Sequence, residues 1–162
     1  MSLPGATPFA RHDHAGCIAS ALAAADARCA AQQVQLTPVR RRTLEILLEA
    51  HEALGAYDVL SRLDADGFGS KPPVAYRALS FLVEQGLAHR IERLNAFVAC
   101  THPGASHDPA FLICRGCGTV AEAETVPGGA LARAADAAGF RIEQTVIEVE
   151  GLCPACQKED DA

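Results

Sequence analysis

Two Cys-x-x-Cys pairs in the last third of the chain have the residue type and spacing of a metal site. Cys114 and Cys117 form the first pair, and Cys153 and Cys156 form the second. Two such pairs supply four soft thiolate ligands, which suit a tetrahedral Zn2+. The 35 residues between the pairs exceed the gap of a compact zinc ribbon. We therefore expect the ion to join distant parts of the chain and to stabilise a domain.

Other uses of these cysteines are weaker alternatives. A closed shell of four sulfurs leaves no coordination position for a substrate, so we do not expect catalysis there. Disulfides are rare in a reducing compartment, and the seven cysteines of the chain cannot all pair internally. Buried free thiols are the plainer alternative for the pairs. We expect Cys17, Cys29 and His51 to be structural bystanders.

A second candidate set holds one cysteine, two histidines and one glutamate, namely His89, Cys100, His107 and Glu122. One thiolate, two neutral imidazoles and one carboxylate make a tetrahedral set whose two negative charges balance those of Zn2+. Taken singly, such residues are more often solvated or part of a core. Glu124 lies on the same face of the predicted strand as Glu122, so the residues alone leave the carboxylate ligand open. Further residues could bind metal adventitiously or replace one of these ligands: His12, His14, His102 and Asp108.

The elements that must position these residues begin with two helices. The alanine-rich run over residues 17–33 predicts the first. Thr37 and Pro38 have the residue types of an N-cap and a first helical position. Apolar residues at helical spacing then continue to Leu54. We therefore expect a second helix that runs from Pro38 and is closed by Gly55.

Apolar periodicity between turn signals predicts the rest of the amino-terminal part: helices over 56–63 and 74–85 and strands over 87–91 and 96–100. Pro72 and Pro73 open the last of these helices, and Gly86 ends it. Helix, turn, helix and hairpin is the order of a winged helix-turn-helix. Its last helix is the one that enters the major groove of DNA.

A turn-rich segment over residues 101–109 predicts a hinge. Beyond it we expect a strand over 111–114, a strand that ends at Glu124, a helix over 129–138 and a strand over 140–149. A sheet this small buries too little area to be stable alone, so it needs a partner subunit as well as zinc.

The predicted fold class is therefore α+β, a winged helix-turn-helix followed by a small α/β dimerisation domain. Its parts are a flexible tail over 1–14, a DNA-binding domain over 15–100, the hinge over 101–109 and a zinc-stapled dimerisation domain over 110–162.

The composition is that of a globular protein, which we expect in the cytoplasm, and the distribution of charge reconciles an acidic chain with DNA binding. The chain has 162 residues, of which 49% are hydrophobic and 21% charged, and its net charge is −6. Residues 1–100 hold 10 basic and 10 acidic residues, whereas residues 101–162 hold 4 basic and 10 acidic ones. The neutral first part can present a local basic face to phosphates. Neither a signal-peptide run nor an apolar stretch of about 18 residues occurs, so we expect no membrane partner.

Several segments resemble a known family: Lys71-Pro72-Pro73, Tyr76-Arg77-Ala78-Leu79, the run from Phe81 to His89, the Cys114-x-x-Cys117-Gly118 knuckle, and Val146-Ile147-Glu148-x-x-Gly151-Leu152-Cys153-x-x-Cys156. They look like the ferric uptake regulator family, and most like its zinc uptake regulator branch. The resemblance implies a homodimer with one structural tetrathiolate zinc. It also implies one regulatory zinc, held by the residues that match the family's ligands: His89, Cys100, His107 and Glu122. Each subunit would then bind two zinc ions.

Two departures from the family pattern qualify this resemblance. The iron-sensing branch typically has a dense histidine-rich stretch before the knuckle, which residues 101–108 lack, and this favours a zinc sensor. Val74 stands where the family usually has Ser or Thr. Valine can neither cap a helix nor donate to a phosphate, so some affinity is lost or is supplied by Ser70 and Lys71.

For contact with DNA we expect Arg77, whose guanidinium can pair with guanine O6 and N7. Tyr57 resembles a family residue that touches the duplex, and Lys71 and Arg40 are further candidates. The alternatives are that Arg77 pairs with a glutamate on its own surface and that Tyr57 packs in the helical core.

The ligands of the second set belong to the winged helix, the hinge and the dimerisation domain, so one ion would tie the domains together. We therefore expect a zinc-responsive repressor of zinc uptake and homeostasis genes, with Zn2+ as corepressor on an inverted-repeat operator. The alternatives are an iron- or peroxide-responsive regulator of the same family and, less favoured, a zinc-dependent hydrolase. A thiolate ligand disfavours the former, and a filled tetrahedron disfavours the latter and any enzyme.

Overall fold

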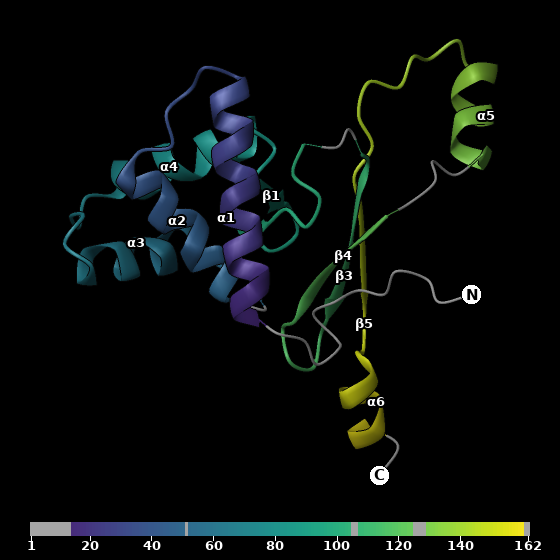
Figure 1. The fold of residues 1–162 in the computed structure, drawn as a ribbon. Coiled ribbons are helices and arrows are strands. Elements are labelled where there is room, and N and C mark those ends of the chain that lie inside the picture. Colours follow the sequence, from purple (N-terminus) through teal and green to yellow (C-terminus); the bar gives the residue numbers. More distant parts are fainter. Residues whose placement is uncertain (1–13, 51, 105–106, 125–128, 161–162) are drawn as a thin grey trace.

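A computed structural model describes residues 14–50, 52–104, 107–124 and 129–160 of the chain (Figure 1). His12 and His51 lie outside the described residues, as do the side chains of His14 and Glu124. Of the predicted tail over residues 1–14, only His14 is described, as the first residue of a helix.

Helices and a hairpin form the amino-terminal part of the molecule. They are α1 (His14–Ala31), α2 (Pro38–Glu49), α3 (Ala56–Ala65), α4 (Pro72–Glu84), β1 (Ala88–Ile91) and β2 (Ala96–Ala99). The strands pair antiparallel, with Ala88 opposite Ala99. Ile46, Leu63 and Leu79, from α2, α3 and α4, are fully buried where these helices meet. The predicted winged helix-turn-helix is thereby confirmed.

The end of α4 follows from its glycine. The backbone N–H of Leu87 donates to the carbonyl of Leu82 at 2.8 Å, and that of Gly86 donates to the carbonyl of Val83 at 3.0 Å. These are the bonds of a Schellman motif, which needs a residue with positive φ after the helix. Gly86 has a φ of 68°, so its predicted role as the end of α4 is confirmed.

The second helix is shorter than predicted. It ends at Glu49, and Leu54 does not continue it. Instead, Leu54 exchanges backbone hydrogen bonds of 3.0 and 2.8 Å with Phe97 of β2. Its side chain is buried against the wing, so an apolar residue at helical spacing belongs to an extended segment. The prediction that the helix continues to Gly55 is therefore wrong.

The carboxy-terminal part is built on β3 (Pro109–Cys114), β4 (Val120–Glu124) and β5 (Ile147–Gly151). They lie in the order β4-β3-β5, with β4 antiparallel and β5 parallel to β3. Figure 1 shows α1 to α4 on one side of this sheet and α5 (Gly129–Ala137) on the other. A further helix, α6 (Pro154–Asp160), follows β5.

One prediction for this part is wrong, and one element was missed. The strand expected over 140–149 begins only at Ile147, because its pairing with β3 starts at Ala110 opposite Ile147. Residues 140–146 have no strand partner among the described residues. In addition, α6 was not predicted, although Pro154 at its first position is a helix-opening signal. No described helix is both long and apolar enough to cross a membrane.

The two faces of the β4-β3-β5 sheet have different neighbours. On one face, Phe111 and Ile113 are buried together with Ile91 of β1, so this face packs against the wing. The other face carries Leu112 and Val149, which are side by side in the register of β3 and β5. Their side chains are 37% and 48% exposed. The sheet therefore has one covered and one open apolar face.

Candidate metal centres and nucleic-acid interface

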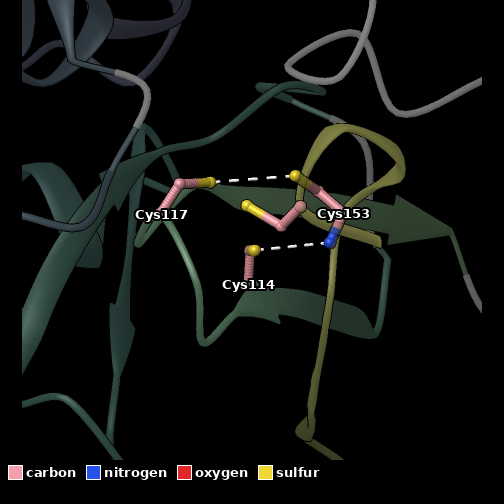
Figure 2. A group of neighbouring side chains, drawn as sticks. Cys114, Cys117 and Cys153 are labelled. Carbon is pink, nitrogen blue, oxygen red and sulfur yellow. Dashed lines mark hydrogen bonds between the residues drawn. The ribbon is translucent and has the colours of Figure 1, made fainter. Parts of the chain in front are cut away.

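The paired cysteines converge at one end of the sheet, and Figure 2 shows three of them, Cys114, Cys117 and Cys153. Cys114 is the last residue of β3, and Cys117 lies in the turn that follows. Cys153 lies between β5 and α6, and Cys156 lies on α6. The four sulfur atoms all lie within 4.8 Å of one another. We call these four residues the knuckle cluster.

The spacing of the sulfurs fits zinc. Sγ of Cys117 and Sγ of Cys153 are 3.8 Å apart, and a tetrahedron with Zn–S bonds of about 2.3 Å has edges of about 3.8 Å. The turn also leaves no room for a larger residue at Gly116. A Cβ atom there would lie 2.9 Å from Sγ of Cys156. The chain is thus shaped closely around the sulfurs.

The thiols of the knuckle cluster differ in acidity. Backbone N–H groups of Cys153 and Cys117 lower the pKa of Cys114 to about 6, and the N–H of Cys153 lies 3.3 Å from that sulfur. The neighbouring sulfurs, that of Cys153 first, raise the pKa of Cys156 to about 12. The hydroxyl and backbone of Thr119 also lower the pKa of Cys117. The protein therefore favours thiolates at Cys114 and Cys117, and a divalent cation would be needed to ionise the whole set.

The second set of ligands also comes together, from four separate segments. His89 lies on β1, Cys100 follows β2, His107 lies between the two sheets in sequence, and Glu122 lies on β4. Their ligand atoms lie within 4.8 Å of one another. We call these residues the bridging cluster, because β1 and β4 belong to different parts of the molecule.

Distances within the bridging cluster leave a nitrogen available for a metal. Nε2 of His107 lies 2.5 Å from Oε1 of Glu122 and 3.8 Å from Sγ of Cys100. Nε2 of His89 lies 3.2 Å from the same carboxylate oxygen. That nitrogen is buried and has no hydrogen-bonding partner among the described residues. A buried ring nitrogen without a partner is costly unless a metal or proton satisfies it, so the residues fit a metal site.

Thr101 orients the carboxylate of the bridging cluster, a role that the sequence reasoning missed. Oε2 of Glu122 accepts hydrogen bonds from the backbone N–H of Thr101 at 2.8 Å and from its hydroxyl at 3.0 Å. Oε1 is left facing the two histidines. The sequence signal was only that Thr101 follows the candidate ligand Cys100.

The surroundings also set the charges of the cluster. Burial raises the pKa of Glu122, but the His89 ring and the Thr101 backbone outweigh it, and the pKa is lowered to about 2. Glu122 is therefore a carboxylate at neutral pH. Burial, followed by the charge of Glu122, raises the pKa of Cys100 to about 12. A bound cation would offset both effects and favour the thiolate.

The other candidate ligands do not join either cluster. Within the described residues, the knuckle and bridging clusters are the groups of ligand atoms that could hold a metal. The ring of His102 lies 6.1 Å from that of His107, and its Nδ1 lies 3.0 Å from the Thr101 hydroxyl. A site involving His12 or His14, or a contribution from the Glu124 side chain, falls outside the described residues.

A groove on the winged helix holds one of the candidate DNA-contact residues, Tyr57. It has a volume of about 460 Å³ and lies between α3, α4 and the wing, with Tyr57, Tyr76 and Arg90 among its lining residues. Tyr57 is 67% exposed, so it does not pack in the helical core. Arg77 is exposed on α4 and forms no ion pair with another described residue. Both side chains can therefore reach a ligand.

The arginines of α2 are occupied within the protein. Arg41 forms an ion pair with Asp26, and Arg42 contacts the carboxylates of Glu45, Glu49 and Asp66. Arg40 has partners of another kind: its guanidinium lies 3.7 Å from the ring centre of Phe81 and donates to the carbonyl of Gln35.

The start of α4 explains the valine in the recognition helix. Lys71 occupies the N-cap position and is exposed. Val74 lies inside the first turn and packs partly against the core of the winged helix. Capping is therefore not the task of this position, and the expectation that Ser70 and Lys71 supply the affinity for phosphate that valine lacks stays a prediction.

Solved structures resemble this chain over most of its length, although no family model matches it. A zinc uptake regulator complexed with zinc and DNA is 37% identical and has a TM-score of 0.83, with 90% of this chain and 98% of that chain covered. Holo XcZur is 36% identical, with a TM-score of 0.76 over 86% and 98% of the two chains. Apo XcZur is 37% identical, with a TM-score of 0.51 over 88% and 99%.

A winged helix joined to a small sheet by a cluster of metal ligands defines the class of metal-responsive transcription regulators. The zinc uptake regulation proteins of Escherichia coli strain K12 and Shigella flexneri are each 41% identical to this chain over 138 residues, which cover 83% of it and 80% of each relative. The chain belongs to the zinc uptake regulator branch of the ferric uptake regulator family.

Proposed function

We propose that this protein is a zinc-responsive, DNA-binding repressor of zinc uptake and homeostasis genes, with Zn2+ as corepressor. One observation carries the proposal: the bridging cluster joins His89 of the winged helix to Glu122 of the β4-β3-β5 sheet. A cluster on this boundary can convert metal occupancy into a fixed position of the winged helix. The knuckle cluster would hold a second, structural zinc, which gives two zinc ions per subunit.

The comparison with the two forms of XcZur supports a metal-dependent domain arrangement. The identity to this chain is nearly the same for the holo and apo forms, 36% and 37%, yet the TM-scores are 0.76 and 0.51. Sequence divergence does not explain that difference, because both forms have similar identity. The arrangement of this chain is the one that resembles the metal-bound relative.

The residues of the bridging cluster favour zinc. Bound Zn2+ would supply the positive charge that stabilises the Cys100 thiolate beside the Glu122 carboxylate. A thiolate suits zinc better than iron, which disfavours the iron- or peroxide-responsive alternative. As a member of its family the protein is a transcription regulator and not an enzyme, so the zinc-dependent hydrolase is no longer proposed.

The open face of the sheet supports a homodimer. Leu112 and Val149 lie on it, and Leu131, Phe140 and Val146 are also exposed, by 56%, 67% and 44%. Large exposed apolar side chains gathered in one part of a chain indicate a surface for a partner. A twofold dimer would present two copies of α4 to an inverted-repeat operator, with half-sites about 34 Å apart.

The same proposal assigns roles along the chain. Residues 15–100 would form the DNA-binding domain, 101–109 the hinge and 110–162 the dimerisation domain, in a protein of the cytoplasm. Arg77 and Tyr57 would contact the bases and the backbone of DNA, and Lys71, at the start of α4, would contact a phosphate. Arg40 remains a weaker candidate, because its cation already has partners within the protein.

Metal analysis combined with DNA binding tests this function. The purified dimer is titrated with buffered zinc or, under reducing conditions, with iron, and binding is measured to a duplex selected by the zinc-loaded protein from a random library. We expect two zinc ions per subunit and a rise in DNA affinity with zinc alone. DNA binding that is independent of zinc, or that responds to iron only, would refute the proposal.

A further inference from the structure

The turn of the wing is held by carboxylates of β5. Oε1 of Glu148 accepts a hydrogen bond from the backbone N–H of Glu92 at 2.7 Å, and Oε2 accepts one from the N–H of Arg93 at 3.0 Å. One carboxylate thus binds two successive N–H groups of the turn between β1 and β2. Such a pair of N–H groups forms a small anion-binding concavity, or nest.

A second contact joins the same two segments. The guanidinium of Arg93 lies 3.1 Å from Oε2 of Glu150, with side chains 54% and 38% exposed. Glu148 and Glu150 are two residues apart on β5, so both point to the face of the sheet that packs against the wing. We call Glu92, Arg93, Glu148 and Glu150 the wing clasp.

The wing clasp crosses the same boundary as the bridging cluster but contains none of its ligands. Its atoms meet only when the winged helix lies against the β4-β3-β5 sheet, since the wing turn and β5 are more than 50 residues apart in sequence. Hydrogen bonds to an ionised carboxylate are stronger than neutral ones. The clasp therefore favours the same domain arrangement as a metal in the bridging cluster.

We propose that Glu148, supported by the Arg93–Glu150 pair, is a positioning residue that sets the zinc concentration at which the protein binds DNA. The inference rests on the proposed function. Two interactions that favour one arrangement are coupled, so weakening the clasp must be offset by more metal. The clasp also pairs the Arg93 cation with Glu150 within the protein, which gives the wing a task in domain docking.

The main test replaces Glu148 by alanine in the full-length dimer. Zinc-buffered titrations would measure binding to the duplex selected by the zinc-loaded wild type. We expect the half-saturating zinc concentration to rise by about tenfold, because two charge-assisted hydrogen bonds are lost. At saturating zinc, the affinity for DNA should return to within about threefold of the wild-type value, because the free energy of zinc binding can restore a shifted equilibrium. A purely structural role would instead lower DNA affinity at every zinc concentration.

Glu159→Ala is the matched control, because it removes the same charge from an exposed position on α6. Its zinc midpoint should equal that of the wild type. An unchanged midpoint for Glu148→Ala, in a dimer that responds to zinc, would overturn the clasp while leaving the proposed function intact. A wild type that does not respond to zinc would overturn both.

If Glu148→Ala does not fold, exchanging the charges of Arg93 and Glu150 tests the wing clasp instead. Arg93→Glu and Glu150→Arg should each raise the zinc midpoint by about threefold, in line with a partly exposed ion pair. The double variant should restore the midpoint, because the pair is formed again with its charges reversed. Additive effects in the double variant would refute the role of this pair.

Discussion

The knuckle cluster and the bridging cluster differ in where the chain supplies their ligands. All knuckle cysteines lie on or next to β3, β5 and α6, within one part of the molecule. The bridging ligands lie on β1, on β4 and in the segment between β2 and β3, so they come from both parts of the molecule. Both clusters bring their ligand atoms within 4.8 Å of one another, so compactness does not separate them.

Under the proposed function, position relative to the domain boundary, more than ligand strength, would separate a structural metal from a sensing one. A metal within one part can stabilise only that part. A metal bound across the boundary changes how the winged helix and the sheet are arranged, and that arrangement can determine whether the protein binds DNA. Four variants test these assignments, beginning with the one whose effect we expect to be strongest.

Cys114→Ser should remove the zinc of the knuckle cluster and unfold the carboxy-terminal part. A structural zinc of this kind contributes about 10–16 kcal/mol in small peptides, which exceeds or matches the stability of a typical domain. Zinc content, sedimentation and circular dichroism would measure the loss of metal, dimer and sheet. Cys17→Ser, at an exposed position on α1, is the control and should change none of them. A stable dimer with two zinc ions in Cys114→Ser would contradict the structural role.

Cys100→Ser should leave the dimer and one zinc ion in place while abolishing the response to zinc. At the zinc concentration that saturates the wild type, we expect DNA affinity to fall by about 100-fold, near the upper end of common coupling energies. Metal analysis and fluorescence anisotropy would measure the two effects separately. His102→Ala, outside the bridging cluster, should keep most of the response. If Cys100→Ser bound DNA as the wild type does, the bridging cluster would not be the sensor.

Arg77→Ala should weaken DNA binding without affecting either cluster. Loss of a bidentate contact to guanine costs about 1–3 kcal/mol, so an affinity loss of about thirtyfold is expected, together with relaxed selectivity at one base pair. Binding to sets of single-base variants of the selected duplex would measure it. An equal loss on every sequence would instead identify Arg77 as a phosphate contact.

Thr101→Val should have the smallest effect. It removes the hydroxyl that donates to Oε2 of Glu122 and keeps the backbone N–H. Residues that orient a metal ligand commonly change metal affinity by 10–100-fold, and we expect about tenfold here because one of the two bonds survives. Competition with a zinc chelator would measure it, and Thr101→Ser should behave as the wild type. Equal affinity in the valine and serine variants would show that the hydroxyl does not matter.

The sequence predicted the features that depend on local residue types. Gly86 marked the end of α4, Pro38 marked the start of α2, and the cysteine pairs marked the knuckle cluster. In contrast, the bridging cluster could not be derived from spacing, because its ligands come from separate segments. The family resemblance was needed to choose Glu122 over Glu124.

The features that were missed depend on contacts between distant segments. Leu54 has helical spacing, yet its backbone pairs with β2, which only the folded wing can offer. Residues 140–146 have strand-like composition, but β3 is too short to pair with them. Thr101 and Glu148 gave no local signal, since each acts on atoms more than 20 residues away.

The alternation of side chains along β5 makes its register a requirement of the whole molecule. Glu148 and Glu150 point toward the wing, whereas Val149 points to the open face. Because successive residues of a strand face opposite ways, deletion of one residue before β5 would exchange these two sets. Carboxylates would then enter the apolar face, and valine would meet the polar turn of the wing. A register shift of a single residue in this short strand would therefore disable domain docking and subunit pairing together.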